Sequence, residues 1–199
     1  MRPPEWNSRG YVPHFDPPGA VQLVTFRTRD SLPAHVTGSM VAELRFVPSD
    51  LRDEAQERRV ESYLASGHGE CLLRRPDVAP IIARTLTHYH DRRYRLVAWC
   101  LMPNHVHVVV TCIEGYSLRA IVHGWKSFSA NEVNRHLGRQ GALWMPDYFD
   151  RVIRDDAHLG QAITYVHANP VRAGLCARDV DWPWSSAREW LSRLSDVSP

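Results

Sequence analysis

Lysine is almost absent from this sequence of 199 residues. Lys126 is the single lysine, so arginine supplies all the other fixed positive charge. The formal net charge of +2 is too small to establish an acidic partner. The arginines nevertheless suit phosphate contacts, because a planar guanidinium can bind two oxygens at once.

Long apolar runs and paired cysteines are missing as well. No apolar stretch approaches the roughly 20 residues that span a bilayer, and residues 1–6 lack the apolar segment of a signal peptide. The four cysteines are scattered without a Cys-x-x-Cys pair, which argues against a disulfide framework or a zinc knuckle. We therefore expect a cytoplasmic protein with no membrane partner.

The length and a hydrophobic content of 44% suit one domain with a sizeable core. Residues 1–20 are rich in proline, glycine and arginine and show no periodicity, so we expect an extended N-terminal arm. The predicted domain covers residues 21–190, and residues 191–199 form a C-terminal tail.

The most informative stretch runs from Trp99 to Thr111 and contains His105 and His107 within a run of valines. Valine-rich alternation favours a strand, whose side-chain period of two places both imidazoles on one face. The intervening valines face the other way and can be buried. Two neighbouring imidazoles on a rigid strand form half of a metal site. The alternative is a polar strand face with satisfied histidines.

Hydrophobic periodicity and capping residues predict the remaining elements. Helical patterning from residue 39 to 66 is broken near Pro48, and the charged residues after it are expected on a solvated face. Strands are predicted over residues 21–28, 94–101 and 143–153, the last interrupted by Pro146. Helices are predicted over residues 51–64, 77–90 and 155–169, the last ending because Pro170 cannot continue it. A further helix is predicted between Ser117, which can cap its start, and Gly138, which lies just past its end.

This order of elements predicts an α+β protein with an antiparallel sheet and helices packed on one face. The two histidines would then point from a central strand toward a helix. Trp125, Trp144 and Tyr148 suit a core better than a base-stacking surface, and His167 is expected on a helix surface.

Five blocks of the sequence resemble, in order, the REP-associated tyrosine transposases, a branch of the single-tyrosine HUH endonucleases. The blocks cover much of residues 20–188 and begin at Tyr94, Trp125, Ala142, Tyr165 and Trp182. The resemblance implies a ferredoxin-like sheet and a transposase that cuts and rejoins single-stranded or hairpin DNA, including repeats of the REP type. Such an enzyme supports DNA transposition, a form of DNA recombination, as a monomer or a homodimer.

The resemblance also assigns roles. Tyr165 is the expected nucleophile, forming a 5′-phosphotyrosine link that keeps the bond energy for rejoining. His105 and His107 are expected to bind Mg²⁺ or Mn²⁺, with Asn169 as a third ligand one helical turn after Tyr165. Imidazole chemistry alone would also admit zinc. The candidate contacts to the DNA backbone are Lys126, Arg119, Arg151 and Arg154.

Two alternatives remain open at this stage. The first is a non-catalytic domain that binds nucleic acid by its sequence or structure, as many ferredoxin-like sheets do. The sequence lacks the aromatic-rich strands typical of an RNA recognition motif. The second is a zinc-dependent hydrolase built on the histidine pair, which needs a further carboxylate or histidine ligand.

Overall fold

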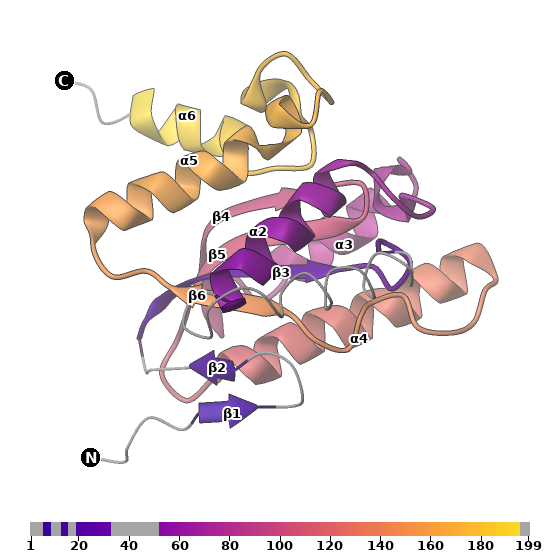
Figure 1. Ribbon diagram of the computed structural model, residues 1–199, viewed down its shortest axis with the longest axis horizontal. Coiled ribbons are helices and arrows are strands. Elements are labelled where there is room, and N and C mark those ends of the chain that lie inside the picture. The colour runs from indigo at the N-terminus through magenta and orange to yellow at the C-terminus, as the bar shows by residue number, and fades with distance from the viewer. Residues whose placement is uncertain (1–5, 9–12, 16–18, 33–51, 196–199) are drawn as a thin grey trace.

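The computed structural model of the protein describes residues 6–8, 13–15, 19–32 and 52–195 (Figure 1). Its centre is an antiparallel sheet of four strands in the order β4-β5-β3-β6. Helical segments connect β3 to β4 and β5 to β6, so the predicted α+β, ferredoxin-like class is confirmed. The strands are β3 (Val21–Arg27), β4 (Tyr94–Leu101), β5 (His105–Cys112) and β6 (Phe149–Val152).

The strands follow the alternation in the sequence closely, except for the last one. β4 has the predicted bounds, and the turn that contains Asn104 leads directly into β5. The strand predicted over residues 143–153 is wrong in length, because β6 covers only Phe149–Val152. Before it, Trp144 forms only an isolated bridge to Thr28. Pro146 has no N–H to donate to a ladder, which explains the gap.

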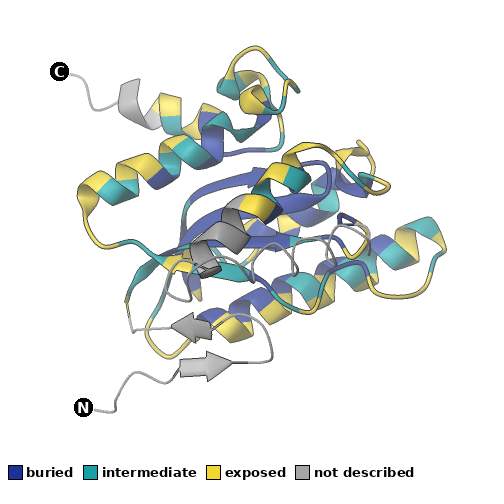
Figure 2. Cartoon of the chain, in the orientation of Figure 1, coloured by how far each residue is buried: buried dark blue, intermediate teal, exposed yellow. Residues whose placement is uncertain are grey.

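One face of the sheet is covered by α3 (Ala79–Thr87) and α4 (Leu118–Leu137). As predicted, α4 begins after Ser117, whose side chain accepts from the Ala120 amide, and ends at Gly138 with a φ of 62°. The even-numbered valines of β5 are fully buried in the main core with residues of these helices. Figure 2 shows that the central strands are largely buried.

The opposite face is covered by α5 (Asp156–Arg172) and α2 (Arg52–Ala65), as Figure 1 shows. Val166 of α5 packs in a second core cluster with Val109 of β5, and Val60 of α2 packs near Phe149 of β6. The prediction of helices on one face thus describes α3 and α4. The sequence pattern predicted α2 and α5 as helices, but it did not predict that they cover this second face and enclose the two histidines.

The end of α5 corrects the prediction that Pro170 terminates the helix. The helix continues to Arg172, because main-chain hydrogen bonds resume after the proline. The Ala173 amide donates to the Asn169 carbonyl, and the Leu175 amide donates to the Pro170 carbonyl.

The remaining helices are short. After α5 the chain turns through η2 (Asp179–Asp181) into α6 (Ala187–Ser195). Another short helix, η1 (Leu72–Arg74), precedes α3.

Within the predicted N-terminal arm, β1 (Trp6–Ser8) pairs antiparallel with β2 (Pro13–Phe15). The break predicted near Pro48 lies outside the described residues. No helix among the described residues is long and apolar enough to cross a membrane.

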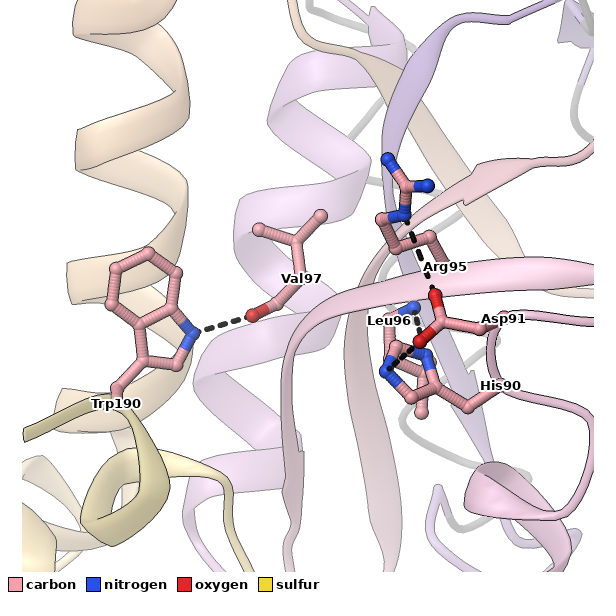
Figure 3. A pocket seen from close by; sticks show the side chains of 6 residues that line it. All are labelled: His90, Asp91, Arg95, Leu96, Val97 and Trp190. Carbon is pink, nitrogen blue, oxygen red and sulfur yellow. Dashed lines mark hydrogen bonds and ion pairs between the residues drawn. The ribbon is translucent and has the colours of Figure 1, made fainter. Parts of the chain in front are cut away.

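Side chains close part of the outer edge of β4, in the pocket that Figure 3 shows. The Leu96 amide donates to Nδ1 of His90 at 3.0 Å, and Trp190 Nε1 donates to the Val97 carbonyl. Nε2 of the same His90 lies 3.4 Å from the Asp91 carboxylate. The main-chain groups that an edge strand usually leaves unpaired are therefore satisfied here by side chains.

Candidate active site

The two histidine side chains converge on one point of the covered face. His105 and His107 are 2% and 1% exposed, and their Nε2 atoms lie 3.0 Å apart. Their rings meet edge to face, with centroids 4.7 Å apart. As predicted, both point from a central strand toward a helix, which is α5.

The neighbours of His105 determine which of its nitrogens carries the proton. The Asn104 amide nitrogen donates to the His68 carbonyl at 2.8 Å, which turns the Asn104 amide oxygen toward His105. That oxygen only accepts hydrogen bonds, so Nδ1 of His105, 2.7 Å away, is the donor. Nε2 of His105 therefore presents a lone pair, which is the form that binds a metal ion.

The second ring is oriented from the neighbouring strand. Thr25 of β3 lies directly opposite His107, and its hydroxyl is 2.8 Å from Nδ1. Burial lowers the pKa of His107 to about 3. Burial also lowers the pKa of His105 well below its usual value, and the electrostatic influence of His107 lowers it further. Both rings are thus neutral at pH 7, as metal ligation requires.

The geometry of the pair suits a small divalent cation. Two ligands at right angles on a cation with bonds of about 2.1 Å are about 3.0 Å apart, which is close to the observed spacing of the Nε2 atoms. The described part of the chain contains no group of three His, Cys, Asp or Glu residues that could hold a metal ion. The alternative zinc hydrolase needs such a third ligand.

The phenol of Tyr165 lies beside this pair. Its ring meets that of His107 edge to face, with centroids 5.3 Å apart, and the side chain is only partly buried. Burial raises the pKa of the phenol, and the charge and hydrogen bond of Glu61 raise it further. Asn169 and Arg172 act in the opposite direction on this pKa. The resting phenol is therefore protonated and hydrogen-bonded to the Glu61 carboxylate.

Asn169 lies one turn beyond Tyr165, as predicted. Its Nδ2 donates to the Tyr165 carbonyl at 2.8 Å, which leaves the amide oxygen Oδ1 for another partner. Arg172 lies a further turn along α5, with its guanidinium carbon 5.7 Å from the centre of the Tyr165 ring. One helix thus carries the phenol, an amide and a cation on neighbouring turns.

The four predicted DNA contacts lie on two parts of the fold, α4 and the end of β6. Lys126 on α4 donates to the Pro146 carbonyl at 2.7 Å, and burial lowers its pKa to about 8, so it joins two segments of the fold. Arg119 is exposed on the same helix, across the sheet from the histidines. Arg151 and Arg154 are exposed in β6 and just after it.

The structure places four further residues that the sequence left between a core and a surface position. His167 is buried and bonds the Ser186 hydroxyl at 2.9 Å, so the expectation of a surface histidine is wrong. Its burial lowers its pKa. Trp125, Trp144 and Tyr148 lie in the main core, as predicted.

Sequence reasoning missed four residues of the site: Thr25, Arg27, Glu61 and Asn104. Thr25 and Arg27 lie opposite His107 and His105 in the sheet register. In the sequence, Thr25 and Arg27 alternate with the apolar residues of β3, and this alternation could have placed both of them on one face of the strand. Burial lowers the pKa of Arg27 to about 10. No local signal singles out Glu61, because charged residues surround it in α2.

The candidate site combines two histidines on one strand with one tyrosine on a helix. Residues 76–169, which include all of these residues, match the family model "Transposase IS200 like".

Two curated relatives carry a more specific description than this family model, because both are described as REP-associated tyrosine transposases. A REP-associated tyrosine transposase from Escherichia coli (strain K12) is 26% identical over 106 residues, which cover 52% of this chain and 60% of the relative. A relative from Haemophilus influenzae, assigned to the same family, is 29% identical over 114 residues, covering 52% of this chain and 62% of that protein. The predicted resemblance is confirmed, over about three fifths of each relative's length.

A solved structure shows the same fold over almost the whole chain. It is that of a REP-associated tyrosine transposase bound to a REP hairpin, with a TM-score of 0.59 at 17% sequence identity. The match covers 96% of this chain and 89% of the other.

Proposed function

We propose that this protein is a transposase that cleaves and rejoins single-stranded or hairpin DNA, with Tyr165 as its nucleophile. The observation that supports this most directly is the contact between the Tyr165 ring and His107, whose Nε2 converges with that of His105. Similarity to REP-associated tyrosine transposases, one of them solved with a REP hairpin, supports hairpin DNA as the substrate.

In this reaction the Tyr165 hydroxyl oxygen attacks a DNA phosphorus atom, and the bond to the 3′ oxygen breaks. The Glu61 carboxylate, hydrogen-bonded to the phenol, accepts the phenolic proton. The departing 3′ oxygen takes up a proton from solvent, so the products are a 5′-phosphotyrosine link and a free 3′-hydroxyl. Attack by a 3′-hydroxyl on the link reverses these changes and restores the phosphodiester, so rejoining requires no nucleotide cofactor.

His105 and His107 would hold Mg²⁺ or Mn²⁺, with the Asn169 amide oxygen as a further ligand. When bound, the cation supplies Lewis-acid neutralisation of the phosphate charge. Arg27, directly opposite His105 and partly buried, is placed to pair with a phosphate oxygen on the same face of the sheet.

The test uses hairpin oligonucleotides with single-stranded flanks, labelled at either end and incubated with Mg²⁺ or Mn²⁺. With the wild-type protein, the 3′ label should migrate with the protein on a denaturing gel and the 5′ label on a free fragment. Tyr165→Phe should give no adduct while retaining DNA binding. An adduct of equal yield with this variant would eliminate Tyr165 as the nucleophile.

The role of Glu61 is tested separately with Glu61→Gln, which keeps the size of the side chain but removes the base. A general base typically contributes a factor of 10² to 10⁴ in rate, so adduct formation should slow about a hundredfold. Glu189→Gln, an exposed change on α6, is the matched control. A rate for Glu61→Gln equal to that of the control would exclude Glu61 as the proton acceptor.

A non-catalytic domain that binds nucleic acid remains the alternative. It would bind the same oligonucleotides without a divalent cation and would form no adduct with any of them. The buried, neutral histidine pair facing a tyrosine favours the catalytic proposal, because binding alone does not require this arrangement.

A further inference from the structure

A cavity of about 520 Å³ lies between α3 and α4, in the range typical of small-ligand sites. These helices pack on the face of the sheet opposite to the histidines, so the cavity is separate from the candidate active site. We refer to it as the α3–α4 cavity.

Aromatic side chains dominate its walls. Trp125 is buried in the wall and donates to the Tyr94 hydroxyl at 2.9 Å. Tyr116 and Phe128 border the cavity while 45% and 58% exposed. Large aromatic surfaces left in water around a concave site are typical of a binding surface. Flat rings at this site offer stacking faces for a flat ligand.

The charges around the cavity are mainly positive. The Arg93 guanidinium stacks on the Tyr89 ring, with its carbon 3.7 Å from the ring centre. Neither Arg93 nor Arg84, which also lines the cavity, has an ion pair with any of the described residues. The acidic lining residue Glu132 is already paired with Arg135.

We propose that the α3–α4 cavity binds an unpaired nucleobase of the DNA substrate. The base stacks on the exposed rings of Tyr116 and Phe128, and its phosphate pairs with Arg93 or Arg84. Unpaired arginines favour this ligand over an apolar peptide, which would leave both charges without a partner. The proposal rests on the proposed function, in that the ligand is DNA. Because the cavity lies across the sheet from Tyr165, the base belongs to a segment other than the cleaved step.

A glycine in the cavity wall provides a variant that fills the space without weakening the fold. Gly124 lies within α4, and a Cβ atom at this position would meet no atom within 4 Å. Gly124→Leu therefore adds a side chain to the cavity and raises helix propensity. Gly160→Leu in α5 is the matched control, because that glycine is also helical, exposed and open at the Cβ position.

The experiment measures the fluorescence anisotropy of a labelled hairpin oligonucleotide with single-stranded flanks, in EDTA so that cleavage does not intervene. Gly124→Leu should weaken binding at least tenfold relative to wild type and to Gly160→Leu. Phe128→Ala should weaken it about tenfold, as expected for the loss of one base-stacking contact. Equal affinity for all four proteins would overturn the proposal.

Two further measurements separate the possible failures. If the wild-type protein and Gly124→Leu form equal adduct at limiting DNA, the cavity proposal fails while the proposed function stands. If the wild-type protein neither binds nor forms an adduct with any oligonucleotide, the proposed function fails. A Gly124→Leu variant with unchanged DNA affinity but an altered sedimentation coefficient would instead indicate a contact between copies of the chain, and would also overturn the proposal.

Discussion

The two faces of the central sheet differ sharply, although alternate residues of the same strands form them. Toward α3 and α4, β3 and β5 present mainly apolar side chains, such as Phe26 and Val108, within the largest core cluster. Toward α5 and α2, the same strands present Thr25, His105 and His107. Neighbouring positions of one strand therefore contribute to the main core on one face and to the candidate site on the other.

The difference shows how a buried polar site can exist in a chain of this size. Burying an imidazole carries a desolvation cost, which the hydrogen bonds of His105 with Asn104 and of His107 with Thr25 offset. The opposite face needs no such partners, because it gains free energy by removing apolar surface from water. If this division is correct, substitutions on the two faces should produce separable effects.

The largest effect is expected from removal of the histidines. His105→Ala and His107→Ala should each lower the rate of adduct formation by about a thousandfold or more, because cation binding requires both rings. Gel assays with Mn²⁺ and Mg²⁺ measure this rate, and His123→Ala, an exposed change on α4, is the control. A rate near that of the control for either variant would contradict a role for the pair in catalysis.

The opposite result is expected for the apolar face. Phe26 is 1% exposed and meets the ring of Trp144 edge-on at 4.9 Å. Phe26→Ala should reduce the free energy of unfolding by about 3–5 kcal/mol, as is usual for a buried aromatic residue. Urea denaturation measures this loss. The folded variant should retain its adduct rate at a temperature well below its midpoint, and a large loss of rate there would break the division between the faces.

The histidine pair should also make stability depend on pH. The folded pKa of His107 is about 3, against about 6.5 in an unfolded chain, and that of His105 is lowered in the same direction. Below pH of about 6.5 the unfolded chain therefore binds more protons, so the free energy of unfolding falls as the pH drops toward about 3. The expected slope is about 1.4 kcal/mol per pH unit for each imidazole.

Urea midpoints between pH 7 and pH 5, measured in EDTA, test this dependence. The double variant His105→Asn/His107→Asn should show a clearly smaller change over the same range. A wild-type midpoint that is constant or rises on acidification would show that the rings are not held neutral in the fold.

The smallest effect is expected from the residue that orients His107. Thr25→Val keeps the shape of the side chain but removes the hydroxyl that lies 2.8 Å from Nδ1. Cation affinity should fall about tenfold, the lower end for loss of a group that orients a metal ligand. Mn²⁺ titration measures this, with Thr111→Val, farther along β5, as the control. Equal affinities would mean that packing alone orients the ring.

Local patterns in the sequence predicted most of the fold. The valine alternation of β5, the Ser117 cap and Gly138 each depend on neighbouring residues, and all were placed correctly. The end of α5 was predicted wrongly, because the helix continues past Pro170 through main-chain hydrogen bonds formed beyond the proline. The covering of the second sheet face was also missed, since it depends on how α2 and α5 pack in three dimensions.

The same distinction applies to the candidate site. The motif and the resemblance predicted the histidine pair, Tyr165 and Asn169. The structure brings both histidines and Tyr165 together, and Asn169 donates a hydrogen bond to the Tyr165 carbonyl. Glu61 joins them from a helix about a hundred residues away in sequence, a contact that no spacing rule reveals. The roles of these residues, including the metal ligands, stay predictions until the variants are measured.

The closed outer edge of β4 bears on how copies of this protein can associate. At Leu96 and Val97, hydrogen bonds to His90 and from Trp190 occupy main-chain groups that a strand from another molecule would need. Extension of the sheet across this stretch would require the indole and the imidazole to be displaced first. Self-association should therefore use surfaces other than this stretch of β4. The same two rings also oppose the growth of a continuous intermolecular sheet from this stretch.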